Sequence, residues 1–203
     1  MTGARVRIKI CGVRTAEIVQ VAAEAGADAV GFVLAPGSPR RIDAETAVDL
    51  AATLPPWVAP VAVFADAEVD EMLGAWPHDW IQLHGREADV HPALARRSVV
   101  KAVPITVGDE ELLRWDAHPR VRALLVDAPR AGAGETFDLA PLVRVRARLG
   151  KPLIVAGGLT PRNVARIIRE VHPWAVDVSS GVESSRGTKD ASLIREFCDA
   201  VRA

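Results

Sequence analysis

Short apolar runs alternate with longer amphipathic stretches along the whole chain. The apolar runs have the length of buried strands, whereas the amphipathic stretches repeat their apolar residues at helical spacing. This alternation predicts eight strands, each followed by a helix. The expected strands are 6–10, 29–34, 58–64, 80–83, 99–103, 123–126, 154–156 and 175–178. The expected helices are 15–25, 44–54, 68–75, 88–96, 109–114, 139–149, 163–171 and 190–201.

Regular alternation of strands and helices favours a parallel sheet covered by helices, in one of two architectures. Units of about 25 residues are compact but sufficient for a closed (β/α)8 TIM barrel, which we expect as a single domain over residues 1–203. The rival is an open doubly wound sheet, which would require a G-x-G-x-x-G turn after the first strand. The chain reads Cys11-Gly12-Val13-Arg14 there, so we favour the closed α/β barrel.

The composition argues against several classes of function. Hydrophobic residues make up 49% and charged residues 25% of the chain, which is typical of a globular protein. A formal net charge of −1 gives no basis for a nucleic-acid partner or a polybasic membrane surface. The short polar start is unlike a signal peptide, and no apolar run is long enough to span a bilayer. Cys11 and Cys198 lie at opposite ends of the chain, so no disulfide framework is expected and the cytoplasm is the simplest location.

Polar residues at the strand ends occupy the alternate positions whose side chains should face into the barrel. Alternation along the first strand turns Ile8 and Ile10 toward the helices and Cys11 into the barrel, at the carboxyl end where TIM barrels carry their chemistry. The same alternation places Asp127 inward at the end of the sixth strand. Further polar side chains expected on the inner face are Lys9, Gln82, His84 and Asp177.

Each of these residues also has a purely structural interpretation. An isolated buried cysteine is commonly a small apolar side chain, an aspartate can brace a loop, and His84 suits a loop hydrogen bond. Cys198 lies within the last expected helix and is expected in the core. No set of His, Cys, Asp and Glu shows a convincing metal-ligand spacing, so neither a metal nor another cofactor is expected.

A glycine turn follows the seventh strand. Gly157-Gly158 ends the apolar run, and Thr160 as N-cap with Pro161 is a good opening for the next helix. Backbone amides and a helix N-terminus suit an anion, most often a phosphate, although an ordinary strand-to-helix connection explains the turn equally well. Ser180-Gly181 after the eighth strand favours phosphate, because barrels commonly hold phosphate between the loops after strands seven and eight.

Together these motifs resemble the phosphoribosylanthranilate isomerases of tryptophan biosynthesis. The resemblance runs from the first strand to the last helix, and the combination is more specific than the glycine pair alone. The matching segments are Lys9-Ile10-Cys11-Gly12, 26–32, Ser38-Pro39-Arg40, Gln82-Leu83-His84-Gly85, Leu125-Val126-Asp127, Thr136-Phe137-Asp138, Gly157-Gly158-Leu159-Thr160-Pro161, Asn163-Val164, 176–183 and Lys189-Asp190.

The resemblance implies an isomerase that converts N-(5'-phosphoribosyl)anthranilate to 1-(2-carboxyphenylamino)-1-deoxyribulose 5-phosphate by an Amadori rearrangement. It implies that Cys11 is the general base and Asp127 the general acid. It also implies a small-molecule phosphosugar substrate and no cofactor, and leaves the oligomeric state open. Arg40 would face the anthranilate moiety, and the two glycine-containing loops would hold the phosphate. The expected substrate-binding residues are Arg40, Gly157, Gly158, Asp177, Ser180 and Gly181.

The rearrangement needs an acid and a base beside the reacting carbons. A carboxylic acid with a raised pKa can protonate the ring oxygen as the C1–O bond breaks, and a thiolate can then remove the acidified C2 proton. A free thiol has a pKa of about 8.5, so Cys11 needs a neighbour that favours its thiolate. Lys9 lies on the same strand face and is a candidate. The alternative is a simple ion pair between Lys9 and an inward acid such as Asp177.

Two departures from the family pattern lie near the expected substrate. Glu135 stands where a lysine is common, in a loop less rich in glycine than the family pattern, and Leu139 stands where a tryptophan is common. These changes bear on affinity for the substrate more than on reaction type.

Two other functions stay open on the sequence, namely another phosphosugar isomerase or epimerase and a catalytically silent phosphosugar-binding barrel.

Overall fold

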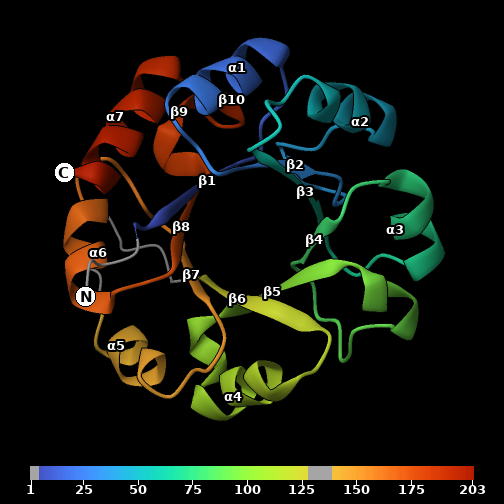
Figure 1. Cartoon of the computed structure of the whole chain (residues 1–203), viewed down its shortest axis with the longest axis vertical. Helices are drawn as coiled ribbons and strands as arrows, with labels where there is room; N and C mark the ends of the chain where they lie inside the picture. The colour runs from blue at the N-terminus through green and yellow to red at the C-terminus, as the bar shows by residue number, and fades with distance from the viewer. Residues whose placement is uncertain (1–4, 128–138) are drawn as a thin grey trace.

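Eight parallel strands form a closed barrel that follows the order of the chain. The computed structural model describes residues 5–127 and 139–203. Strand β1 pairs with β2 on one side and with β8 on the other, which closes the sheet on itself. The view down the barrel shows the helices arranged around the outside of the strands (Figure 1). The expected closed barrel is therefore confirmed, and the open doubly wound sheet is excluded.

The strands and helices lie close to the expected ranges. The barrel strands are β1 Arg7–Cys11, β2 Ala29–Val33, β3 Ala59–Phe64, β4 Trp80–Leu83, β5 Ser98–Pro104, β6 Val121–Asp127, β7 Leu153–Ala156 and β8 Ala175–Val178. The α-helices are α1 Ala16–Glu24, α2 Ala44–Ala52, α3 Val69–Ala75, α4 Asp109–Ala117, α5 Ala140–Arg146, α6 Val164–Val171 and α7 Ala191–Arg202. Short 3-10 turns are η1 Pro92–Arg96, η2 Ile105–Val107 and η3 Ser180–Val182, and a small hairpin joins β9 Glu183–Ser185 to β10 Thr188–Lys189.

One expected helix and one expected helix cap were wrong. The helix expected over 88–96 is only the 3-10 turn η1, because Pro92 disfavours helical geometry at His91, which has φ −57° and ψ 137°. The imidazole of His91 accepts a hydrogen bond from the backbone of Ala93 and begins the short turn instead. The N-cap of α6 is Asn163 rather than Thr160, and Thr160 contributes only its carbonyl, which accepts from the Val164 amide at 3.1 Å.

Residues of β1 show how strand alternation divides the core into two layers. Ile8 and Ile10 are buried between the barrel and the surrounding helices. Lys9 and Cys11 point to the other side, into the barrel, where Cys11 belongs to a small buried cluster with residues of β2 and β3 such as Val33 and Val63. The polar side chains buried in the barrel include Lys9, Gln82 and Asp177, so its interior is not purely apolar. These buried polar side chains contribute to the site at the carboxyl ends of the strands.

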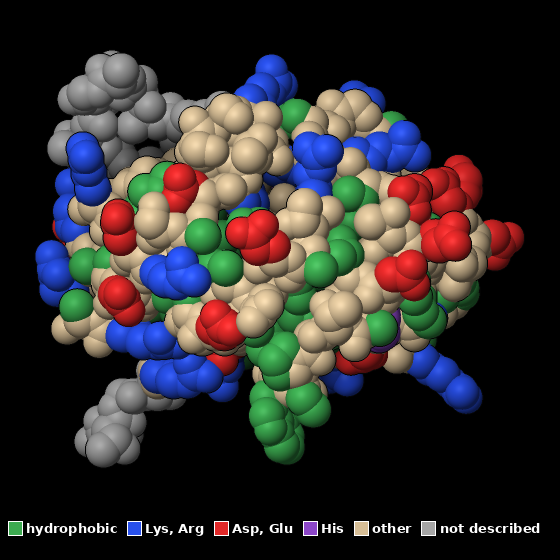
Figure 2. All heavy atoms as spheres, turned by 90° about the horizontal axis from the view of Figure 1, so that it is seen from above, with side chains coloured by type: hydrophobic (Ala, Val, Ile, Leu, Met, Phe, Trp, Pro, Cys, Tyr) green, Lys and Arg blue, Asp and Glu red, His purple; other side chains and the backbone are tan. Residues whose placement is uncertain are grey.

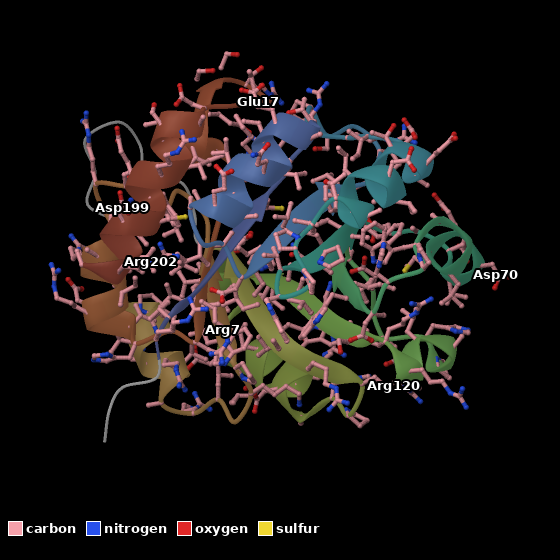
Figure 3. The ribbon with its side chains drawn as sticks, turned by 45° about the horizontal axis from the view of Figure 1, so that its top comes forward. Arg7, Glu17, Asp70, Arg120, Asp199 and Arg202 are labelled. Carbon is pink, nitrogen blue, oxygen red and sulfur yellow. The ribbon has the colours of Figure 1, made fainter. Side chains whose placement is uncertain are left out.

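The last helix covers the seam where β1 meets β8. Asp190 caps α7 by accepting hydrogen bonds from the amides of Ser192 and Leu193, and Phe197 buries its ring completely against the barrel. Arg202, at the other end of the helix and labelled in Figure 3, donates to the carbonyl of Gly26 at 2.9 Å. Helix α7 therefore connects the C-terminal part of the chain to the segment that follows α1.

The outer surface carries mixed charges. On the face drawn in Figure 2, acidic and basic side chains are spread among apolar and neutral ones, with several acidic side chains gathered toward one edge. Within residues 5–127 and 139–203, none of the helices combines the length and the apolar character needed to cross a membrane.

We expect Phe197→Ala to lower the free energy of unfolding by about 3–5 kcal/mol, because a fully buried ring leaves a cavity under α7. Denaturation with urea, followed by circular dichroism, measures the change. Val143→Ala is the matched control, since Val143 is 43% exposed and its truncation should stay within about 0.5 kcal/mol. Equal effects of the two substitutions would contradict this account of the core.

Candidate functional site

A cavity of about 550 Å³ opens at the carboxyl ends of the barrel strands. All the residues expected from the sequence to form the site line this one cavity, although they come from both halves of the chain. They are Cys11, Arg40, Asp127, Gly157, Gly158, Asp177, Ser180 and Gly181. The cavity is therefore the place where their chemistry can combine.

The glycine turn after β7 has a backbone that only glycine adopts without strain. Gly157 and Gly158 have φ values of 84° and 62°, in the left-handed region. Asn163 holds the turn, because its side chain accepts a hydrogen bond from the Thr160 amide at 2.8 Å and donates to the Gly158 carbonyl at 2.9 Å. The turn is thus fixed before any ligand binds.

The loop after β8 closes against this turn and forms the second wall. A Cβ atom on Gly181 would lie 1.7 Å from the Leu159 carbonyl oxygen, so only glycine permits the close approach of the two loops. Within the described parts of the chain, the amides of Gly158, Ser180 and Gly181 have no hydrogen-bond acceptor. Amides without acceptors, on residues that line the cavity next to the start of α6, suit a phosphate group.

Cys11 lies at the end of β1, beside a buried ion pair. Its thiol is almost fully buried, and burial raises its pKa, whereas the positive charge of Lys9 lowers it. Lys9 Nζ also donates to Asp177 Oδ1 at 2.8 Å. The ion pair expected as the alternative role of Lys9 is therefore present, and the charge of Lys9 still acts on the thiol.

Asp127 ends β6 and meets a chain of polar side chains from β4. Its Oδ2 lies 3.6 Å from His84 Nε2, and His84 Nδ1 lies 3.0 Å from Gln82 Nε2. Gln82 is buried, and its Oε1 has no hydrogen-bond partner among the described residues. The contact from Gln82 orients the imidazole, so His84 is a positioned neighbour of the carboxyl group.

Arg40 is held at the rim by Glu183. The guanidinium donates two hydrogen bonds to the Glu183 carboxylate, from Nε at 2.6 Å and from Nη2 at 2.8 Å. The stem of Arg40 lies over Gly12, where a Cβ atom would be 2.6 Å from Arg40 Cδ. A bidentate ion pair with a packed stem fixes the direction of the guanidinium.

Glu183 and Lys189 do not line the cavity but bind residues that do, and the sequence alone assigned them no role. Lys189 Nζ donates to Glu183 Oε1 at 2.8 Å and to the Ser179 carbonyl at 3.0 Å, while Ser179 Oγ donates to the Cys11 carbonyl at 3.0 Å. The hairpin of β9 and β10, which turns at Gly187, brings the two charges together. In the sequence, an acidic and a basic residue six positions apart with a glycine between them form the pattern that could have indicated this contact.

Small aliphatic side chains form the wall between β2 and β3. Val33, Ala35, Val63 and Ala65 line this side of the cavity, and the described lining contains no Phe or Trp. Leu139, one of the departures from the family pattern, is buried in the hydrophobic core at the start of α5. Glu135 and the loop expected over 128–136 lie outside the described residues.

Metal ligands are not clustered in the described parts of the chain, where no three His, Cys, Asp or Glu side chains lie together. Both cysteines are free thiols, and Cys198 is buried in the core as expected. Acid–base groups, backbone amides and one fixed guanidinium are thus what the site offers to a ligand.

Comparison with known proteins identifies the family. The model of the N-(5'-phosphoribosyl)anthranilate (PRA) isomerase family matches residues 8–200 of this chain. The chain belongs to this family. The resemblance inferred from the motifs is thereby confirmed, and the activity of the chain is the PRA isomerase activity of tryptophan biosynthesis.

Relatives and solved structures cover almost the whole chain. The PRA isomerase of Pseudomonas aeruginosa strain UCBPP-PA14 is 44% identical over 205 residues, which cover 98% of this chain and 96% of the relative. The crystal structure of the Thermotoga maritima PRA isomerase aligns with a TM-score of 0.86 at 37% identity, over 97% of this chain and 98% of that one. A PRA isomerase in complex with reduced 1-(o-carboxyphenylamino)-1-deoxyribulose 5-phosphate aligns with a TM-score of 0.84 at 36% identity, over 97% and 98% of the two chains.

The contacts of Glu183 predict a stability contribution that depends on pH. Burial raises the pKa of Glu183, but hydrogen bonds from Arg40 and Lys189 outweigh it and lower the pKa to about 2. Glu183→Gln should therefore destabilise the fold by about 1–3 kcal/mol at neutral pH, because two cations lose their carboxylate. The folded-state pKa is depressed, so this contribution is complete above pH 4.5 and is lost as the pH falls toward about 2.

Urea unfolding of both proteins between pH 7 and pH 3 checks the effect. The gap between wild type and Glu183→Gln should narrow as the pH falls. Glu196→Gln serves as control, because Glu196 is an exposed carboxylate on α7 and its replacement should open no such gap. A gap for Glu183→Gln that does not change with pH would contradict the assignment of the ion pairs.

Proposed function

We propose that Cys11 is the general base and Asp127 the general acid of the Amadori rearrangement of PRA in this chain. The observation that carries this proposal is that a thiol and a carboxyl group from β1 and β6 line the same cavity as the two glycine-containing loops. An acid, a base and a phosphate anchor in one cavity are the parts that an aldose-to-ketose isomerisation requires.

The first step opens the ribose ring. Asp127 donates its proton to the ring oxygen while the C1–O bond breaks, and the lone pair of the anthranilate nitrogen forms the C1=N iminium. The positive iminium makes the C2 proton acidic. The Cys11 thiolate then takes this proton, the electrons of the C2–H bond form the C1=C2 double bond of an enolamine, and the π electrons of the C1=N bond return to the nitrogen. Tautomerisation moves the enol proton to C1 and leaves the ketone at C2.

Two groups would hold the ends of the substrate. The amides of Gly158, Ser180 and Gly181 would bind the phosphate, supported by the fixed turn at Gly157. The guanidinium of Arg40 would bind the anthranilate carboxylate, and the ring would lie against the aliphatic wall between β2 and β3. Asp177 lines the same cavity, with its carboxylate engaged by Lys9.

A thiol base must stay reduced, which favours a reducing cytoplasm as the location of the enzyme.

Removal of either proton-transfer group should abolish most of the turnover while the fold is kept. We expect Cys11→Ala and Asp127→Asn each to lower kcat by roughly 10²–10⁴-fold. PRA generated in situ with purified protein, without added metal, reports the activity through the decay of its fluorescence. Cys198→Ala is the matched control, because this second thiol lies outside the cavity and its loss should leave kcat near the wild-type value. Full activity of either site variant would refute the assigned role.

Gly181→Ala should weaken phosphate binding specifically. The added methyl group would collide with the Leu159 carbonyl, so the two loops must separate and their amides no longer converge. We expect the KM for PRA and the inhibition constant of inorganic phosphate to rise roughly tenfold or more, which corresponds to about 1.4 kcal/mol of binding free energy. Gly74→Ala, in α3 with open space around its Cα, is the control and should change neither constant. Unchanged phosphate inhibition in Gly181→Ala would place the phosphate elsewhere.

A further inference from the structure

A buried cation and the proposed base share one small space inside the barrel. A Cβ atom on Gly31 would lie 2.9 Å from Cys11 Sγ and 3.0 Å from Lys9 Nζ. The Cys11 sulfur and the Lys9 ammonium therefore fill the space beside β2 that a side chain at position 31 would otherwise occupy. Lys9 and Cys11 are 6% and 7% exposed, so the interaction between their charges is only weakly screened by water.

The register of the strands explains this arrangement. Cys11 pairs with Gly31 across β1 and β2, and Lys9 pairs with Asp177 across β1 and β8. Lys9 and Cys11 are two positions apart, so both side chains point inward, with the lysine one layer below. The long stem of Lys9 can thus place its ammonium between the Asp177 carboxylate and the sulfur.

Four charged groups act on Cys11 from the surrounding elements. Lys9 comes from its own strand, Asp177 from β8, Lys189 from β10 and Arg40 from the loop after β2. The cations Lys189 and Arg40 both bind the Glu183 carboxylate, which offsets part of their charge. Lys9 has the largest charge effect on the thiol, and it lowers the pKa of Cys11, whereas Asp177 raises it.

We propose that Lys9 is the counter-ion that stabilises the Cys11 thiolate, with Asp177 holding the ammonium and Gly31 providing the space in which it meets the sulfur. This assignment makes Lys9 a positioning residue that acts through Cys11, and its catalytic consequence rests on the proposed role of Cys11 as base. When the thiol is protonated, the ammonium is bound by Asp177. When the thiolate forms, the ammonium faces two anions. Once the sulfur accepts the C2 proton, that charge disappears and the original ion pair is restored.

The ionisation of Cys11 can be measured without catalysis. In a Cys198→Ala background, Cys11 is the single remaining thiol, and it lines the cavity, where a small reagent such as iodoacetamide can reach it. The rate of alkylation as a function of pH gives the pKa of the Cys11 thiol. Lys9→Met should raise this pKa by about 1–2 units, because an adjacent cation is lost. Asp177→Asn should lower it, because the anion is lost and Lys9 turns fully toward the sulfur.

Two further variants separate this effect from general damage to the fold. Lys101→Met removes another buried lysine, which binds Glu87 outside the barrel and should leave the pKa of Cys11 unchanged. The double variant Lys9→Met/Asp177→Asn leaves no unpaired charge in the barrel and should show a raised thiol pKa. It therefore tests the proposal even where Lys9→Met alone does not fold.

Opposite shifts for the Lys9 and Asp177 variants would support the proposal, and the ascending limb of the kcat/KM profile should move with the alkylation pKa. No shift, or shifts of the same sign, would overturn it. Failure of the proposed function has a different signature, because Cys11→Ala would then keep its turnover whatever the alkylation experiments show.

Discussion

The ion pair between Lys9 and Asp177 is the interaction on which the rest of the site depends. It joins the first and the last strand of the barrel inside a space that water scarcely reaches. Removal of one partner from such a pair costs about 3–5 kcal/mol, because the other charge is left buried and uncompensated. The next inward positions along the same strands are Cys11 and Ser179, which are themselves linked by a hydrogen bond. The catalytic rim thus rests directly on a fixed electrostatic layer.

A second ionic cluster lies above this layer and connects the rim to the outer loops. Glu183 binds both Arg40 and Lys189, and Lys189 also binds the loop that begins at Ser179. One carboxylate between two cations leaves net positive charge at a place where the substrate would bring a carboxylate. Because the cluster is formed without ligand, little rearrangement is needed when the substrate binds, and preorganised charges are more effective than those that must move.

The sequence predicts those parts of the site that follow from strand periodicity. Cys11, Asp127, Lys9 and Asp177 could be placed inside the barrel because inward and outward positions alternate strictly along each strand. The Glu183–Lys189 contact could not be placed, because it depends on the hairpin from Glu183 to Lys189, which lies outside the barrel sheet, rather than on a barrel strand. The helix expected over 88–96 failed for a local reason, since a single proline outweighed a favourable pattern.

The buried ion pair also explains why a thiol suits the end of β1 better than a carboxylate. Asp177 already places one negative charge in the barrel, and a second carboxylate beside it would be opposed by repulsion and by desolvation. A thiol, with a free pKa of about 8.5, can be neutral under conditions in which a carboxylate would be charged. It is also small enough to fit beside Gly31, where the space is shared with the Lys9 ammonium. The thiol at the end of β1, the missing side chain on β2 and the inward lysine therefore all agree with one electrostatic constraint.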